Sequence, residues 1–301
     1  MQVGVHLPQL ALVEESISAS RLRTTVEAAR TLGYAAVSAN DHLDFAAPWL
    51  DGLVALAAVA PAAGDLELMT SVALPSVRGA APLAAAVAAL SRIADGRVVA
   101  GVGPGSSAAD QRLVGRDLDD RWPRFDAAVA ELRELLDPDN AAPPASVAVA
   151  AGPIPVWVAS WGSPAGLRRV ARLGDGWLAS AYNTTPDEFR AGRERLTDEL
   201  ARQGNPASED FPHALVTMWF WVTDDGREAS RLIDQMLAPM LRRDPAELRE
   251  RVCVGSAEQC ADLLGRYAEA GCIRTHVWPL GDEAGQLECL MSDVLPRTRA
   301  S

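Results

Sequence analysis

Short apolar runs alternate with amphipathic segments along almost the whole chain. The first apolar run is residues 3–7, and residues 20–32 follow with apolar side chains at helical spacing and Gly33 at their end. Runs this short, bounded by turn residues, are typical of buried strands, and the longer periodic segments are typical of helices that cover them. The pattern therefore predicts a parallel sheet with helical connections.

The same alternation continues to the last apolar run. It predicts eight strands, at residues 3–7, 35–39, 66–74, 97–102, 156–159, 176–181, 214–222 and 273–278. The predicted helices are residues 20–32, 50–62, 83–94, 121–136, 164–173, 186–203 and 257–270, with further helices up to residue 251 and a surface loop at 138–151.

Eight strands separated by helices predict an α/β fold, a single-domain (β/α)8 TIM barrel over residues 1–296, with a short polar tail at 297–301. A doubly wound open sheet is the alternative. In a barrel the functional residues lie at the carboxyl ends of the strands, so those positions are where chemistry is expected.

Composition narrows the chemistry. All 28 Lys+Arg residues are arginine, so enzymes that need a lysine amine, such as Schiff-base aldolases, pyridoxal-phosphate enzymes and Walker-type nucleotidases, are excluded. The net charge of -12, without a dense run of arginines, argues against nucleic acid or an anionic membrane as partner. A small organic molecule is the expected partner.

Location and metal content are predicted from what the chain lacks. The N-terminus has no basic and apolar signal segment, and the most apolar stretch, residues 46–63, contains Asp51, prolines and a glycine, so no membrane span is expected. The four cysteines have no zinc-like spacing. We expect a cytoplasmic protein without a metal, with reduced, buried thiols, and a homodimer, as is usual for barrels of this kind.

Two histidines lie at predicted strand ends. His42 follows the second strand in the run Asn40-Asp41-His42, where an imidazole suits a general acid or base. An Asp-His turn that only caps the next helix explains it equally well. His6 ends the first strand, where a catalytic role competes with that of a core or mouth-lining histidine.

Two loops suggest anion binding. The fourth strand runs into Gly103, Gly105 and Ser106, where bare backbone can approach an anion, although a tight turn explains these residues too. After the fifth strand, Ser163 and Pro164 are suited to cap a helix whose free N–H groups bind a phosphate. Ordinary helix capping is the alternative.

Four segments, residues 3–9, 38–42, 96–105 and 155–177, resemble the luciferase-like flavin and deazaflavin oxidoreductases, and within them the enzymes that use coenzyme F420. Residues 254–258 and Gly271 support the likeness more weakly. The resemblance covers nearly the whole chain and implies the barrel fold.

The resemblance also implies roles for single residues. His42, helped by His6, would handle protons at the substrate, and Asp41 would lie near the ring of the cofactor. Ser71 and Val72 match a bulge with a non-prolyl cis peptide that supports the ring from behind. The remaining residues implied in cofactor binding are Gly103, Gly105, Ser106, Ser160, Trp161, Gly162 and Ser163.

Two positions depart from the sugar-phosphate dehydrogenases of this family. They have a glutamate where this chain has Ser106, and a tryptophan where it has Ala46. Without lysine, the usual cationic cradle for a substrate phosphate is also missing. We therefore do not expect glucose-6-phosphate oxidation.

The predicted function is hydride transfer between coenzyme F420 and an organic, apolar or secondary-metabolite substrate. The alternatives are an FMN-dependent monooxygenase that uses reduced FMN and oxygen, and a non-catalytic flavin-binding barrel. Tryptophans are expected to complete the substrate pocket, with some of them in the core: Trp157, Trp161, Trp177, Trp219 and Trp278.

Overall fold

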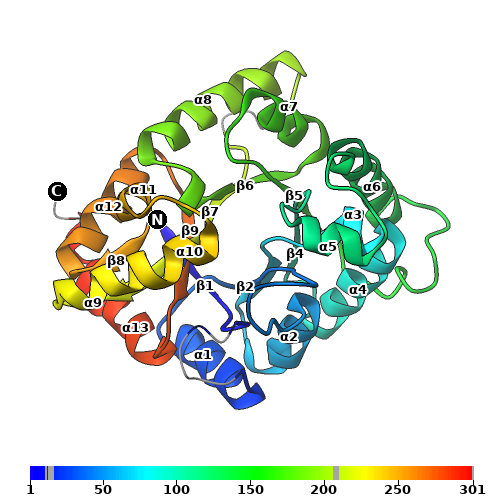
Figure 1. The fold of residues 1–301 in the computed structure, drawn as a ribbon. Helices are drawn as coiled ribbons and strands as arrows, with labels where there is room; N and C mark the ends of the chain where they lie inside the picture. Colours follow the sequence, from blue (N-terminus) through cyan, green and yellow to red (C-terminus); the bar gives the residue numbers. More distant parts are fainter. Residues whose placement is uncertain (11, 13–16, 206–209, 300–301) are drawn as a thin grey trace.

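Nine parallel strands form one sheet that closes on itself (Figure 1). The computed structural model describes residues 1–10, 12, 17–205 and 210–299. The strands are β1 (Gln2–His6), β2 (Ala36–Ala39), β3 (Glu67–Thr70), β4 (Val98–Val102), β5 (Val156–Ala159), β6 (Gly176–Ser180), β7 (His213–Val222), β8 (Cys253–Gly255) and β9 (Arg274–Pro279).

The helices surround the sheet (Figure 1). The α-helices are α1 (Ala19–Thr31), α2 (Gly52–Val59), α3 (Pro75–Arg78), α4 (Ala80–Ile93), α5 (Ala108–Leu113), α6 (Arg121–Leu136), α7 (Pro164–Leu173), α8 (Pro186–Arg202), α9 (Gly226–Arg231), α10 (Ala238–Leu241), α11 (Pro245–Arg249), α12 (Ala257–Glu269) and α13 (Glu283–Cys289). Shorter 3-10 or π turns are η1 (Ala60–Ala62), η2 (Ala181–Asn183), η3 (Leu232–Leu237), η4 (Leu290–Val294) and η5 (Arg297–Arg299).

Closure makes the fold a (β/α)8 barrel, as predicted. Strands β1 to β6 pair in chain order, β9 pairs with β1 and β7, and β7 pairs with β6. The eight barrel strands are thus β1 to β7 and β9. The ninth strand, β8, pairs with Phe220–Val222 at the end of β7 and lies outside the ring. The sequence pattern missed β8 because three residues are too short to show a period.

Several elements differ from the prediction. The third strand ends at Thr70 and not at residue 74, because the chain turns at Ser71–Val72, whose peptide bond is cis, as the resemblance implies. Helix α13 and the short helices α3 and α5 were not predicted. Of the predicted tail, residues 297–299 form η5, while 300–301 lie outside the described residues.

Apolar side chains form three clusters. The largest lies between the strands and the surrounding helices and includes Val5, Val37 and Val277. A second fills the barrel interior around Met69 and Trp157. The alternation of inward and outward side chains along each strand produces this division.

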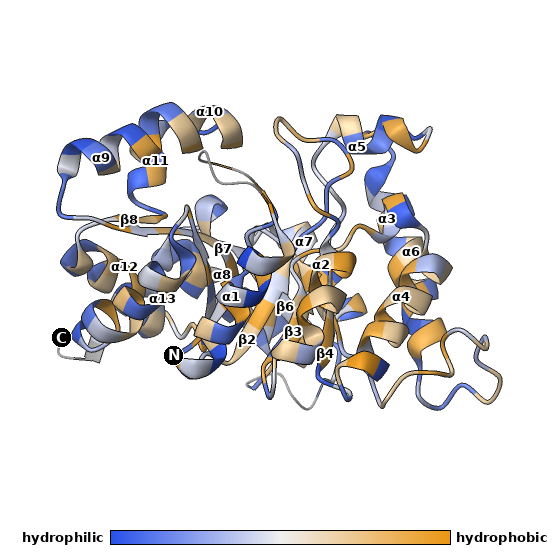
Figure 2. Cartoon of the chain, turned by 90° about the horizontal axis from the view of Figure 1, so that it is seen from below, coloured by the Kyte–Doolittle hydropathy of each residue, from blue (hydrophilic) through white to orange (hydrophobic). Residues whose placement is uncertain are grey.

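The third cluster lies at the carboxyl end of the barrel. It joins Trp219 and Trp278, at the ends of β7 and β9, to apolar side chains of the segment from α9 to α11. Figure 2 shows α9, α10 and α11 above one side of this end and α5 above the other. Both insertions follow barrel strands, so they frame the end where a site is expected.

Most of the thiols are buried, as expected, and no described helix is a candidate membrane span. Cys253, Cys260 and Cys272 are buried free thiols, while Cys289 is only partly buried. Among the helices that the structure describes, none combines the length and the apolar character needed to cross a bilayer.

Two histidines are completely buried inside the barrel. His6 and His276 have no exposed surface, and burial lowers the pKa of each to about 3. The Nε2 atom of each has no hydrogen-bond partner among the described residues. Both imidazoles are therefore neutral in the folded protein at neutral pH, whereas they would titrate near 6.5 in the unfolded chain.

This difference predicts loss of stability in acid. Below pH 6.5 the unfolded state binds protons that the folded state refuses until about pH 3, so the free energy of unfolding falls as pH falls across this interval. Each histidine contributes a slope of about 1.4 kcal/mol per pH unit. In urea unfolding at pH 7 and pH 5, His276→Gln should show the smaller loss; equal losses in variant and wild type would contradict the prediction.

Candidate active site

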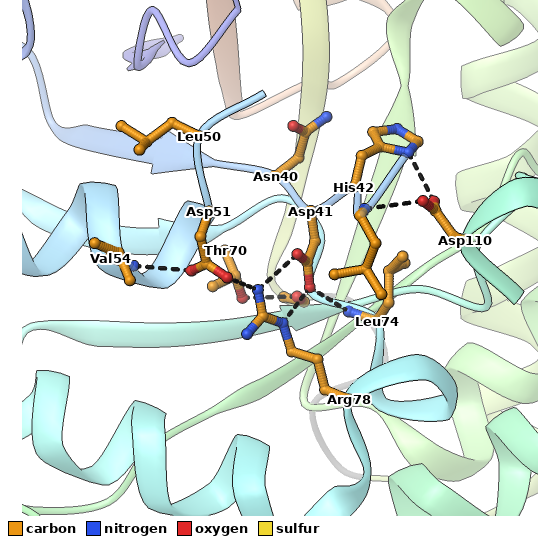
Figure 3. A network of polar contacts seen from close by, with 12 residues as sticks. Asn40, Asp41, His42, Leu50, Asp51, Val54, Thr70, Leu74, Arg78 and Asp110 are labelled. Carbon is orange, nitrogen blue, oxygen red and sulfur yellow. Dashed lines mark hydrogen bonds and ion pairs between the residues drawn. The ribbon is translucent and has the colours of Figure 1, made fainter. Parts of the chain in front are cut away.

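The imidazole of His42 is held by a carboxylate that the sequence did not indicate. His42 Nδ1 lies 2.8 Å from Asp110 Oδ2, across 68 positions of sequence (Figure 3). The side chain of Asp110 is 1% exposed and that of His42 is 20% exposed. The pair thus has a buried acidic member and a basic member that reaches solvent.

Asp110 also fixes the loop on which His42 stands. Its Oδ1 accepts hydrogen bonds from the backbone N–H groups of Leu43, at 2.9 Å, and Asp44, at 2.8 Å. Burial acts to raise the pKa of Asp110, but the hydrogen bonds from His42, Asp44 and Leu43 outweigh it and hold that pKa below its ordinary value. The carboxylate is therefore ionised at neutral pH.

An ionised carboxylate can only accept hydrogen bonds, so Nδ1 of His42 must carry the proton of the pair. Nε2 is then left to accept a proton from a bound molecule or, when protonated, to return it. Of the two sequence interpretations of His42, the geometry favours acid–base chemistry over simple capping, because no helix N-terminus in the described chain uses the His42 side chain as its cap.

Helix α5 brings Asp110 to this position. Ser107 caps the helix by accepting a hydrogen bond from the N–H of Asp110 at 3.2 Å, so the carboxylate leaves the first turn of α5 toward the loop after β2. The serine-capped turn is a local signal that could have located α5. Its contact with His42 has no local signal, because it depends on the placement of strands β2 and β4.

Asp41 takes part in a separate ion-pair network (Figure 3). Arg78 donates through Nε to Asp41 Oδ2 at 2.5 Å and through Nη2 to Asp41 Oδ1 at 2.7 Å, and it also binds Asp51. The N–H of Leu74 adds a third bond to Asp41. Both oxygens of Asp41 are thus engaged, and its predicted position beside a cofactor ring stays a prediction.

The contacts between Arg78, Asp41 and Asp51 shift the pKa values of Arg78 and Asp51. Hydrogen bonds and charge from Asp41 and Asp51 raise the pKa of Arg78, against the effect of its burial. Burial acts to raise the pKa of Asp51, but bonds from Arg78 and the N–H of Val54 bring it below the ordinary value. The network links α3 to both ends of the loop that carries His42, through Asp41 and Asp51, and so stabilises the position of that loop.

Aromatic rings surround the exposed side of His42. Phe45 lies 5.0 Å from its ring centroid and Trp49 lies 4.7 Å away, edge to face. Trp49 in turn contacts Trp278 at 5.8 Å. The accessible Nε2 of His42 is therefore next to an apolar, aromatic wall.

A stack of three rings continues this wall into the barrel. His6 lies flat on Trp278, with 3.4 Å between centroids, and Trp278 stacks on Trp219 at 4.2 Å. His6 Nδ1 donates to the carbonyl of Leu7 at 2.9 Å, which leaves Nε2 as an acceptor. A neutral, fully buried His6 can accept a hydrogen bond in the site, but it does not hold an acidic proton at neutral pH.

The five predicted pocket tryptophans lie in different places. Trp219 and Trp278 belong to the wall just described, whereas Trp157 is in the barrel interior. Trp177 packs on Phe189, 5.1 Å away, between the sheet and α8. Trp161 is 53% exposed, with the Arg243 guanidinium above its ring at 5.6 Å.

Buried polar atoms at the strand ends indicate where a cofactor ring fits. Ser71 and Asn40 directly follow β3 and β2, and His6 is the last residue of β1; these three strands are adjacent. Ser71 Oγ, Asn40 Oδ1 and His6 Nε2 each lack a hydrogen-bond partner among the described residues. Such atoms are costly unless a ligand or water satisfies them. A flat heterocycle with donors and acceptors on its edge would do so.

The start of the loop after β4 passes so close to Val72 that only a glycine fits at residue 103. A Cβ at Gly103 would lie 2.6 Å from Cγ2 of Val72, so the bare backbone lets β4 pass the turn at Ser71–Val72. Gly105 and Ser106 follow in the turn into α5, and Ser106 is exposed. The structure thus brings Val72 and Gly103 together, while Ser106 lies at the rim.

The second predicted loop has the geometry of an anion site. Ser163 caps α7 by accepting the N–H of Gly166 at 3.1 Å, and Ser160 Oγ accepts the N–H of Gly162 at 3.2 Å. Gly162 has φ of +88° with open space beside it. A phosphate at this loop would meet the N-terminus of a ten-residue helix and two hydroxyls. The residues present therefore fit both the ring and the phosphate of a flavin-like cofactor.

The two departures from the sugar-phosphate dehydrogenases look different in three dimensions. Ala46 is exposed, yet an indole still contacts His42, because Trp49 supplies it. Ser106 is exposed, yet a carboxylate still contacts His42, because Asp110 supplies it. The His42 imidazole thus has an indole and a carboxylate beside it, those of Trp49 and Asp110.

Comparison with known proteins agrees with the resemblance. The family described as luciferase-like monooxygenase matches residues 1–245. An F420-dependent glucose-6-phosphate dehydrogenase of Amycolatopsis mediterranei (strain U-32) is 28% identical over 306 residues, which cover 84% of this chain and 85% of that protein.

Solved structures share the fold. The monooxygenase RslO1 from Streptomyces bottropensis has a TM-score of 0.82 at 19% identity, with 98% of this chain and 99% of that one covered. An F420-dependent secondary alcohol dehydrogenase in complex with an F420-acetone adduct has a TM-score of 0.81 at 18% identity, with 99% of both chains covered. At these identities the likeness shows the barrel architecture alone.

The hydrogen bonds of Asp110 predict how its loss would affect the loop. Asp110→Ala leaves two backbone N–H groups and one imidazole without their acceptor, so we expect a loss of about 2–4 kcal/mol in the free energy of unfolding. The amide protons of Leu43 and Asp44 should also exchange faster with solvent.

Asp120→Ala provides the control, because the Asp120 side chain is 74% exposed and its ion pair with Arg124 is 3.8 Å long. It should change stability by less than about 0.5 kcal/mol. Unchanged exchange rates at Leu43 and Asp44 in Asp110→Ala would show that Asp110 does not hold the loop.

Proposed function

The chain belongs to the luciferase-like monooxygenase family, and from that premise we propose that it transfers a hydride between coenzyme F420 and an apolar organic substrate. The observation that carries the proposal is the His42–Asp110 pair, open to solvent through His42 and bordered by aromatic rings at the carboxyl end of the barrel. Hydride transfer to or from a carbon bound to oxygen needs such a proton carrier at that oxygen.

Two parts of the site would hold the cofactor: the polar atoms at the strand ends and the loop after β5. The polar atoms of Ser71, Asn40 and His6 would meet the edge of the ring, and the loop from Ser160 to Ser163 would meet the phosphate. When bound, the deazaflavin supplies a ring carbon that accepts or delivers a hydride.

His42 would provide the matching proton step. Asp110 keeps the proton on Nδ1 and keeps the ring in one orientation, so Nε2 faces the site as the atom that takes a proton from a substrate hydroxyl or returns one to a carbonyl. When the imidazole takes a proton from a substrate hydroxyl it becomes positively charged, and the Asp110 carboxylate stabilises that charge.

The aromatic wall would select the substrate. Phe45, Trp49 and Trp278 place apolar ring surface next to His42, while the nearby Arg78 is already paired with Asp41 and Asp51. A substrate phosphate would therefore have to compete with two carboxylates for Arg78. This supports an apolar alcohol or ketone and disfavours glucose-6-phosphate, the substrate in the name of the relative from A. mediterranei.

Binding and turnover test the proposal together. If the proposal holds, the wild-type protein binds reduced or oxidised F420 more tightly than FMN in a titration followed by fluorescence. His42→Asn should lower turnover of an apolar secondary alcohol or ketone by about 10²–10⁴-fold. Its affinity for F420 should change little, since Asn40, Ser71 and Ser163 are untouched.

Three results would contradict this. Tight binding of FMN without binding of F420 would favour an FMN-dependent monooxygenase; a Baeyer-Villiger monooxygenase in complex with FMN has the same fold. Unchanged turnover in His42→Asn would remove the proton role. Efficient oxidation of glucose-6-phosphate would overturn the proposed substrate class.

A further inference from the structure

A groove lies on the outside of the barrel between α7 and α8. It has a volume of about 310 Å³ and is lined by Ala165, Arg168, Arg169, Arg172, Glu199 and Gln203. Three of its six lining residues are arginines, although the chain as a whole carries a net charge of -12. The groove is therefore a local exception to the acidic character of the protein.

The arginines are not fully neutralised. Arg169 and Arg172 share one carboxylate, that of Asp126. Arg168 is exposed and makes no hydrogen bond or ion pair within the described part of the chain. The three arginines and Asp126 together carry a net charge of +2.

The opposite wall adds no net charge. Glu199 of α8 is paired with Arg202 at 2.5 Å, and the Arg202 side chain is 63% exposed. Gln203 contributes an amide that can donate a hydrogen bond. The groove as a whole thus keeps its two positive charges and offers donors on both walls.

The groove begins next to the loop that fits a phosphate. Ala165 is the second residue of α7, about 3 Å along the helix axis from the Ser163 cap. On the other wall, Arg195 of α8 donates to the carbonyl of Gly162 at 3.4 Å, and Glu199 follows one turn later. A chain that leaves the phosphate loop over Ala165 would therefore enter the groove directly.

We propose that this groove binds an anionic tail that continues beyond the phosphate of the cofactor, and that it thereby favours coenzyme F420 over FMN. The proposal rests on the proposed function and deepens it. F420 extends past its phosphate into a chain of carboxylates, whereas FMN ends at the phosphate. Guanidinium groups bind carboxylates through paired hydrogen bonds. Arg168 has no partner among the described residues, and Arg172, whose side chain is 57% exposed, shares Asp126 with Arg169 and keeps N–H groups for a further carboxylate.

The test compares two forms of one cofactor. F420 with an oligoglutamate tail and F420 without glutamates share the ring and the phosphate, so their difference in Kd reports the tail alone. An exposed ion pair contributes up to about fivefold in affinity. We expect the wild type to bind the long-tailed form about tenfold more tightly at low ionic strength, and the advantage to shrink below about twofold near 0.5 M salt, where charges are screened beyond roughly 4 Å.

Variants assign the effect to the groove. In the double variant Arg168→Gln/Arg172→Gln the advantage of the long tail should fall below about twofold, while the Kd for the tail-less form and for FMN stays unchanged. Arg23→Gln is the matched control, because Arg23 is 65% exposed on α1 and has only a 3.8 Å ion pair to Glu27. It should keep the full advantage.

The outcomes separate the two proposals. Equal affinity of the wild type for both forms, or an advantage that survives in Arg168→Gln/Arg172→Gln, would overturn the groove proposal and leave the proposed function intact. Binding of neither form, together with tight binding of FMN, would overturn the proposed function itself.

Discussion

Closure of the sheet is the constraint on which the rest of the structure depends. The pairing of β7 with both β6 and β9 turns a row of parallel strands into a ring, and because all strands run in one direction their carboxyl ends meet at one opening. His6 ends β1, and Asn40 and Ser71 directly follow β2 and β3, so the parallel pairing of these strands brings the three residues to the same opening. The same constraint places the loops after β4 and β5 on the opposite side of the opening.

Charge in this protein is arranged in pairs and chains because its cations are all arginines. A guanidinium can bind two carboxylates at once, and Arg78 does so with Asp41 and Asp51, which joins α3 to the loops after β2. An ion pair between Arg21 and Glu283 joins α1 to α13. Asp110 is different, because its partners are an imidazole and two backbone N–H groups, and this leaves a titratable group at the opening.

The elements with strong local patterns were the predictable ones. Helices α6 and α7 and strand β5 begin and end where the sequence indicates, because capping residues and apolar periodicity mark both ends. The turn after Thr70 was implied by resemblance and not by propensity. Strand β8 and helix α5 were missed because each is short, and their stability comes from the barrel that they join and not from their own sequence.

The sequence by itself determined the order of strands and helices, the excess of acidic groups, the loop that caps α7 and the histidine at the end of β2, since each depends on residues that are close together in the chain. Only the tertiary structure decided which side chains meet. It paired His42 with Asp110, it placed Trp49 against the His42 ring, and it placed Trp177 between the sheet and α8 instead of at the opening. Such contacts depend on strand register and helix placement, which arise from the packing of the whole barrel and leave no local trace in the sequence.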